Sequence, residues 1–189
     1  SASVTTAHSS ASRRSARART WLEAPGASAM SSGPGAPRRS CRAAPHSAAT
    51  PLQAGQAMRG RRSPDLDAVA RDLHGRRLPP LILIHGDCDG VVAFDNARAS
   101  AALWLDLLPE NTRITENEGE IRRGSRLPCS RHDWRLARQP YVRLLRIRGL
   151  THAWSGGASG HAFSEPRGPD ALKMAWQFFA ATMEKAAPA

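Results

Sequence analysis

The spacing of apolar and polar positions divides the chain into a first third without a regular pattern and a remainder with recognisable elements. Residues 1–62 show no apolar repeat of two or of 3.6 residues and consist mainly of Ser, Ala, Arg, Pro and Gly. Such a composition leaves little apolar surface to offset the entropy lost on ordering the chain. The pattern predicts a disordered low-complexity segment over residues 1–62 and a folded part over residues 63–189.

Four elements are predicted after Arg62. The run Leu81–Ile84 is apolar on both faces, which is typical of a strand inside a parallel sheet covered by helices. The next segment, DNARASAALWLDLL, predicts a helix with Asp95 capping its first turn. Its apolar residues at helical spacing are Ala97, Ala101, Trp104, Leu105 and Leu108.

A polar stretch over residues 109–140, with a turn signal at NEGE, precedes a second strand at YVRLLRIR, Tyr141–Arg148. Arginines on both faces indicate that one side is wet, so we expect this strand at a sheet edge. GPDALKMAWQFFAATM predicts a last helix after a Gly-Pro start. The apolar residues at helical spacing in this helix are Leu172, Ala175, Trp176 and Phe179. We interpret Trp176 and Phe179, together with Trp154 of the preceding turn, as core or pocket wall. Strand, helix, strand and helix in this order predict an α/β fold with a parallel sheet.

The N-terminal third of the chain is strongly basic. The formal net charge is +11, and Glu23 is the one acidic residue before Arg62. A basic excess is typical of polyanion binding, but no aromatic residues alternate with these arginines as single-strand binding requires, so we do not expect a nucleic-acid partner. A basic, Ser-rich start is also typical of a transit peptide, and localisation stays open. No stretch is apolar enough for a signal peptide or a membrane span, so no membrane partner is predicted.

The candidate chemistry lies in two turns, HGDCDG after the first strand and GLTHAWSGG after the second. Sites in open parallel sheets lie outside the carboxyl ends of the strands. If the two strands are neighbours, an aspartate and His152 face one crevice. A carboxylate can then fix the imidazole tautomer while the imidazole takes a proton from a serine. On spacing alone Asp87 is as plausible as Asp89, and His152 could also be a satisfied core histidine.

Three segments, PPLILIHGDCDGVVAFDNA, VRLLRIRGLTHAWSGG and FSEPRGPDALKMAWQFF, together resemble the C-terminal half of the polyhydroxybutyrate-depolymerase-type esterases. This family is a branch of the α/β-hydrolases, and the resemblance covers roughly residues 53–179. It implies a partial α/β-hydrolase fold in which Asp89 is the triad acid and His152 the triad base. It also implies an ester substrate, either a short-chain polyester or a small acyl ester. Thr151 stands where the family usually has Gly.

The nucleophile is the missing part of this triad. The closest match to Gly-x-Ser-x-Gly is GASAM, residues 26–30, which makes Ser28 the candidate nucleophile. The match lacks its second glycine and a preceding apolar strand, and no upstream strand supplies an oxyanion hole. We therefore expect the chain to be incomplete and inactive. GC-rich DNA read out of frame would explain the first third, and a genuine tail on an inactive hydrolase fragment is the alternative.

No cofactor or metal is predicted, because Cys41, Cys88 and Cys129 lack ligand spacing, and His85 is interpreted as a structural partner. Two further functional hypotheses stay open. One is a nucleic-acid-binding protein that uses the basic tail. The other is a serine peptidase or dienelactone-type hydrolase, against which the HAWSGG turn argues.

Overall fold

The computed structural model describes residues 48–62, 69, 71, 73, 78–122 and 126–183. Ser28 and the rest of residues 1–47 lie outside this range. The elements within it, in chain order, are α2 Pro51–Met58, β1 Leu81–Gly86, α4 Phe94–Asp106, β2 Ile114–Ile121, β3 Cys129–Leu136, β4 Gln139–Ile147, β5 Trp154–Ser155, β6 Ser164–Glu165 and α5 Ala171–Met183.

The main sheet is mixed, with the strand order β1-β4-β3-β2. β1 pairs with β4 in parallel, whereas β4 with β3 and β3 with β2 pair antiparallel. The predicted parallel sheet of a partial α/β-hydrolase is therefore wrong. The cause is the polar stretch over residues 109–140, which forms β2 and β3 as an antiparallel meander leading into β4.

The arginine-bearing β4 and the apolar β1 exchange the places expected for them. β4 lies between β1 and β3, and among the described strands β1 is at the edge of the sheet. Arg143 of β4 is tolerated inside the sheet because the buried Asp133 of β3 accepts from its Nε at 2.6 Å and its Nη2 at 2.8 Å. The expectation that residues 141–148 form an edge strand is thus wrong. The arginine pattern indicated contact with water, but Arg143 is paired with the buried Asp133 carboxylate instead.

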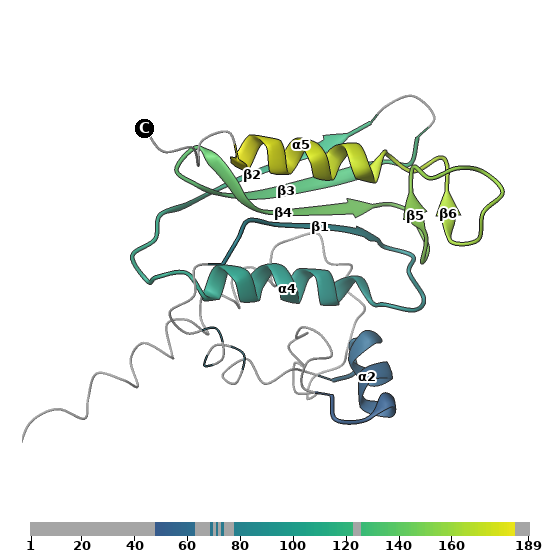
Figure 1. Ribbon diagram of the computed structural model, residues 1–189, viewed down its shortest axis with the longest axis horizontal. Helices are drawn as coiled ribbons and strands as arrows, with labels where there is room; N and C mark the ends of the chain where they lie inside the picture. Colours follow the sequence, from purple (N-terminus) through teal and green to yellow (C-terminus); the bar gives the residue numbers. More distant parts are fainter. Residues whose placement is uncertain are drawn as a thin grey trace, which may run out of the picture.

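Helices cover both faces of the sheet, α4 on one side and α5 on the other (Figure 1). The predicted apolar positions of α4 are confirmed, because Ala97, Ala101 and Leu105 are buried against β4 and β3. Asp95 does not cap the helix: the N-cap is Ala93 without a side-chain bond, and Asp95 lies in the first turn. On the α5 side, the core cluster comprises Cys129, Leu145, Ile147 and Leu150.

The apolar stripe through which α5 was expected to pack against the rest of the fold points outward instead. Leu172, Trp176 and Phe179 are exposed, whereas Ala171 and Phe178 are buried. The Arg143 guanidinium lies over the Phe178 ring, with its central carbon 5.5 Å from the ring centroid. The helix is therefore attached through its other face. The interpretation of Trp176 and Phe179 as core or pocket wall is wrong, because both are exposed and neither lines the pocket described below.

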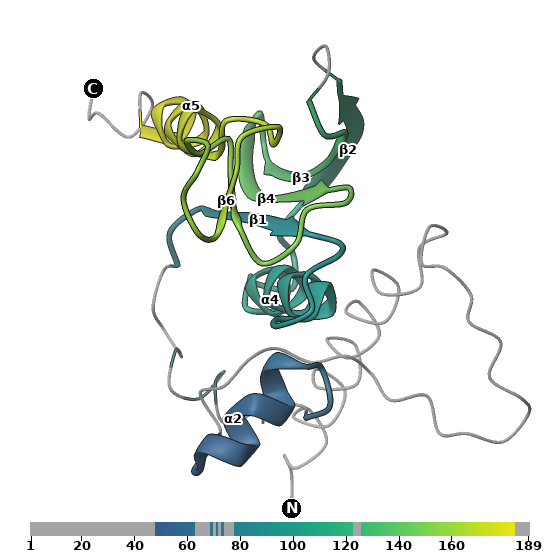
Figure 2. The ribbon, with the colours of Figure 1, turned by 90° about the vertical axis from the view of Figure 1, so that its right-hand side faces the viewer.

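α2 lies within the segment predicted to be disordered, and Figure 2 shows it beside α4. Thr50 caps it by accepting from Gln53 N–H at 3.2 Å. The Met58 carbonyl accepts from Asn96 Nδ2 and from Ala93 N–H, which attaches the end of α2 to the start of α4. The disorder prediction is therefore wrong for residues 51–58. No helix in the described part of the chain has the length and apolarity to span a membrane.

Candidate active site

The ends of β1 and β4 approach closely enough for their two turns to bond to each other. Asp87 N–H donates to the Ile147 carbonyl and Cys88 N–H to the Leu150 carbonyl, both at 3.1 Å. Gly86 makes this approach possible, because a Cβ atom there would lie 2.1 Å from the Leu150 carbonyl oxygen. The glycine of HGDCDG is thus required by the contact between the two turns.

Asp87 links the turns but does not bind the histidine. Its Oδ1 accepts from Gly149 N–H at 2.7 Å, and its Oδ2 accepts from Arg146 Nε at 3.1 Å. Burial raises the pKa of Asp87, but the bonds from Gly149 and Arg146 outweigh it and hold the pKa below its ordinary value. The ionised Asp87 carboxylate therefore links the two turns through hydrogen bonds.

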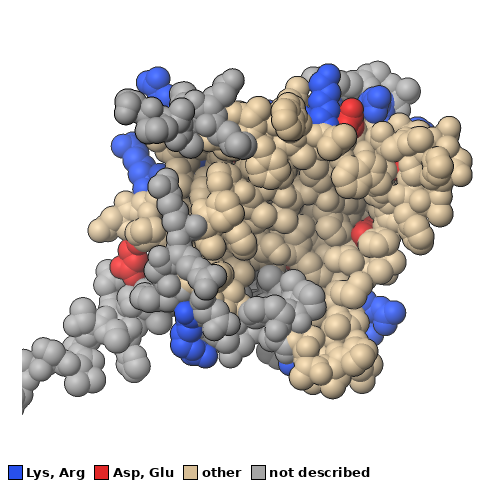
Figure 3. All heavy atoms as spheres, viewed as in Figure 1, with Lys and Arg blue, Asp and Glu red and all other residues tan. Residues whose placement is uncertain are grey.

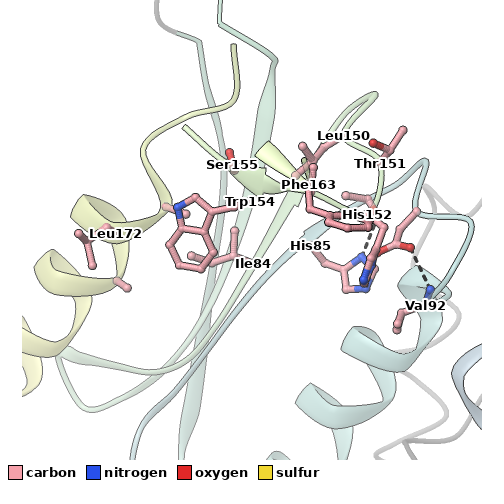
Figure 4. Close-up of a pocket in the computed structure, with 15 residues that line it drawn as sticks. Ile84, His85, Val92, Leu150, Thr151, His152, Trp154, Ser155, Phe163 and Leu172 are labelled. Carbon is pink, nitrogen blue, oxygen red and sulfur yellow. Dashed lines mark hydrogen bonds and ion pairs between the residues drawn. The ribbon is translucent and has the colours of Figure 1, made fainter. Parts of the chain in front are cut away.

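Asp89 contacts His152, as predicted, with 2.9 Å between Oδ2 and Nδ1 (Figure 4). The geometry thereby distinguishes Asp89 from Asp87, while the catalytic roles stay predictions. Asp89 Oδ1 also accepts from the Val91 and Val92 N–H groups at 2.8 and 2.9 Å. Burial raises the pKa of Asp89, but these bonds and the one from His152 outweigh it and lower the pKa.

The orientation of the His152 ring follows from that partner. An ionised carboxylate can only accept, so Nδ1 carries the proton and Nε2 is left as the acceptor. About half of the side chain is exposed, and the Phe163 ring approaches it edge-on at 6.1 Å between centroids. Within the described residues Nε2 has no hydrogen-bond partner, so it can take a proton from a molecule in the adjoining pocket.

The loop that carries His152 packs closely against the segment before α5. Ser155 is buried, and its Oγ donates to the Pro169 carbonyl at 2.6 Å, so its hydroxyl is committed. Gly156 has φ +76°, and a Cβ there would lie 2.7 Å from Asp170 Cα. A Cβ at Gly168 would lie 2.2 Å from Ser155 Oγ. The small residues of HAWSGG therefore serve close packing against the start of α5.

A pocket of about 600 Å³ joins the Asp89–His152 pair to an apolar wall. His152 lies at one end, while Ile84, Trp154 and Leu172 lie toward the other (Figure 4). Figure 3 shows this side of the molecule as a hollowed surface of mostly uncharged residues with Lys and Arg toward its margins. The shape fits an apolar group beside a proton-accepting nitrogen.

The remaining predicted site residues have different outcomes. Ser28 lies outside the described residues, so its relation to His152 stays open. His85 lies in the pocket, with Nδ1 at 2.8 Å from the Gly86 carbonyl and Nε2 at 4.0 Å from Asp89 Oδ2. Its ring also packs edge-on against Phe94. Among the described residues no group of three or more His, Cys, Asp or Glu side chains is arranged to hold a metal.

Replacing His152 with alanine is expected to raise the pKa of Asp89 toward its ordinary value of 3.8, because one hydrogen bond and a nearby positive charge are lost. In the unmodified protein, the lowered pKa of Asp89 stabilises the folded state. This stabilisation is complete above the ordinary pKa of 3.8 and is lost as the pH falls through the folded-state pKa. Carboxyl carbon shifts followed by NMR against pH measure the change. Asp87, which has other partners, is the internal control, and an unchanged Asp89 titration would contradict the expectation.

Comparison with known proteins adds no assignment. No protein-family model matches the chain. No curated protein matches it significantly either. The chemistry of the two turns and of the pocket beside them is therefore the basis for assigning a function.

Proposed function

We propose that Asp89 and His152 are the acid–base part of a serine-type carboxylic-ester hydrolase whose nucleophile lies outside the described residues. The observation that carries the proposal is the 2.9 Å contact between Asp89 and His152 Nδ1 at the mouth of an apolar pocket. A buried carboxylate, an oriented imidazole and a free Nε2 are the parts that activate a hydroxyl. The resemblance of the HAWSGG turn to the polyhydroxybutyrate-depolymerase-type esterases is consistent with this role.

In the proposed reaction a serine hydroxyl attacks the ester carbonyl while His152 Nε2 takes its proton. The imidazolium, stabilised by Asp89, then gives that proton to the departing alkoxide. Water attacks the acyl-serine with His152 again as the base, which releases the carboxylic acid and restores the serine. Asp89 stays ionised throughout, as its lowered pKa allows.

The pocket fits the acyl part of such an ester. Ile84, Trp154 and Leu172 offer an apolar wall, whereas the polar groups lie around His152. A short alkyl chain would lie along that wall and place the carbonyl beside the imidazole. We therefore propose esters of short acyl chains, including short-chain polyesters, as the substrate class.

Binding of an unreactive substrate analogue tests this proposal directly. Heptan-4-one has CH2 in place of the ester oxygen of ethyl butyrate, so it keeps the short chain and the carbonyl but cannot be hydrolysed, and a protein-observed NMR titration would follow its binding. We expect saturable shifts at the His152 ring and the Trp154 indole, lost in Leu172→Lys and retained in Leu52→Lys. Shifts that are absent, or that occur away from the pocket, would refute the assignment of the acyl site.

The 189-residue chain itself is expected to show no turnover of nitrophenyl butyrate above a His152→Ala control. The described residues supply a base and its carboxylate but no free nucleophile beside Nε2. Without the nucleophile the acyl intermediate cannot form, and each missing oxyanion donor costs about 3 kcal/mol in the barrier. An ester assay on soluble protein checks this. Turnover abolished by His152→Ala would show that a nucleophile such as Ser28 is supplied after all.

A further inference from the structure

The pocket holds a general base without a nucleophile beside it among the described residues. His152 Nδ1 contacts Asp89 Oδ2 at 2.9 Å, so Nε2 is left as the acceptor. Ser155 and Thr151 are the two hydroxyl-bearing residues that line the pocket. The Ser155 hydroxyl donates to the Pro169 carbonyl, and Thr151 lies away from the His152 ring (Figure 4). Within this part of the chain, Nε2 can therefore take a proton only from a bound molecule or from water.

Attack of water on a bound ester needs more than this base. Negative charge then builds up on the carbonyl oxygen, and preorganised N–H donors have to stabilise it. The N–H groups that follow His152 are committed elsewhere, since Ala153 donates to the Thr151 carbonyl at 2.8 Å and Trp154 to the Phe163 carbonyl at 2.7 Å. A molecule that spreads the developing charge over its own conjugated system needs no such donors. A carbon acid of this kind therefore suits the site better than water does.

Two aromatic side chains indicate the shape of the molecule that the pocket fits. Trp154 and Phe163 both line it, and the Phe163 ring lies edge-on to the His152 ring with 6.1 Å between the centroids. The two residues are 58 % and 73 % exposed, so their ring faces are available to stack with a flat apolar molecule. A pocket of about 600 Å³ has room for a bicyclic aromatic compound.

We propose that the Asp89–His152 pair abstracts a proton from flat aromatic carbon acids, in which loss of a C–H proton is coupled to the departure of a conjugated oxygen. An oriented base and an apolar pocket are what this reaction requires of the protein. It uses the same histidine as the proposed ester hydrolysis but no serine and no oxyanion hole. The two activities can therefore be tested separately.

The probe 5-nitrobenzisoxazole shows how the step balances. His152 Nε2 takes the proton from the single C–H of the isoxazole ring, and the electron pair of that bond completes the C≡N bond of a nitrile. The ring N–O bond breaks at the same time, and its electron pair goes to the oxygen, which becomes a phenolate conjugated with the nitro group. Asp89 stabilises the imidazolium through Nδ1, and the imidazolium then gives its proton to water.

Absorbance of the nitrophenolate product follows this reaction on the full chain. We expect the unmodified protein to turn over the probe about a hundredfold faster than His152→Ala, the lower end of the range for a positioned general base. Deuterium in place of the transferred proton is expected to slow the reaction, because that C–H bond breaks in the step that His152 catalyses. His132→Ala is the matched control, since His132 lies on β3 between Glu116 and Glu118, outside the pocket.

Asp89→Asn tests the positioning role of the carboxylate. The asparagine oxygen can still accept from the Val91 and Val92 N–H groups, whereas its amide nitrogen can donate to His152 Nδ1. That bond moves the ring proton to Nε2 and removes the base. We therefore expect nearly the loss seen in His152→Ala, together with a reversed His152 tautomer in the NMR shifts of the ring nitrogens.

The outcomes separate this inference from the ester-hydrolase proposal. Turnover that persists in His152→Ala, or that is lost in His132→Ala, would overturn the inference, as would full activity in Asp89→Asn. Absence of turnover in a protein whose pocket still binds heptan-4-one would also overturn it and would leave the ester-hydrolase proposal intact. Turnover that depends on His152 in a protein that does not bind heptan-4-one would support the inference and contradict the acyl site.

Discussion

Replacing Asp133 with asparagine is expected to destabilise the fold by about 3–5 kcal/mol, because it leaves a partly buried guanidinium without its counter-charge. The Asp133 side chain is 2 % exposed and binds Arg143 through both oxygens. Arg131 Nε adds a second positive group at 3.5 Å. Since Arg143 also lies over Phe178, loss of the carboxylate disturbs the attachment of α5 as well as the pairing of β3 and β4.

Urea unfolding followed by circular dichroism measures this effect, with Glu120→Gln as the control. Glu120 binds Arg122 and Arg148 on the exposed side of β2, where such pairs contribute at most about 1 kcal/mol. A double variant, Asp133→Leu with Arg143→Met, is expected to be more stable than Asp133→Asn, because it removes both charges. If Asp133→Asn and Glu120→Gln lowered the free energy of unfolding equally, burial of the Asp133–Arg143 pair would have no energetic consequence.

The second large effect is expected at Gly86, where alanine would push the HGDCDG and GLTHAWSGG turns apart. The added Cβ would lie 2.1 Å from the Leu150 carbonyl oxygen and 2.9 Å from its Cβ. The nearest atom belongs to the backbone, so a side-chain rotation cannot relieve the clash. We expect a loss of about 3 kcal/mol in the free energy of unfolding, the upper end of the usual range for overpacking.

Displacement of the turns would also break the contact between Asp89 and His152. In Gly86→Ala, the His152 Nδ1 nitrogen is expected to lose the NMR shift of a nitrogen that donates to a carboxylate. Gly90→Ala is the matched control in the same turn, since a Cβ there meets nothing within 4 Å. A Gly86→Ala protein of normal stability with an unchanged His152 spectrum would show that the turns do not depend on this close approach.

The strands show where prediction from the sequence fails. β2 and β3 were not predicted, because their polar residues give no period-two signal. Their pairing depends on cross-strand partners such as His132 of β3, which lies between Glu116 and Glu118 of β2 and stacks on Trp134. The Arg-rich β4 was expected at an edge and the apolar β1 inside, whereas the structure has the reverse. The position of a strand is thus decided by residues distant in sequence.

The sequence by itself determined the local features of the site. Apolar spacing predicted α4, and the two turns after Leu81–Ile84 and Tyr141–Arg148 predicted that His152 pairs with Asp87 or Asp89, of which the family resemblance implied Asp89. These signals are local, since a helix face or a strand end depends on neighbouring residues. The tertiary structure showed the different partners of the two carboxylates, His152 for Asp89 and Arg146 with Gly149 for Asp87. It also decided the mixed sheet and the outward α5 stripe, because both depend on contacts between segments far apart in the chain.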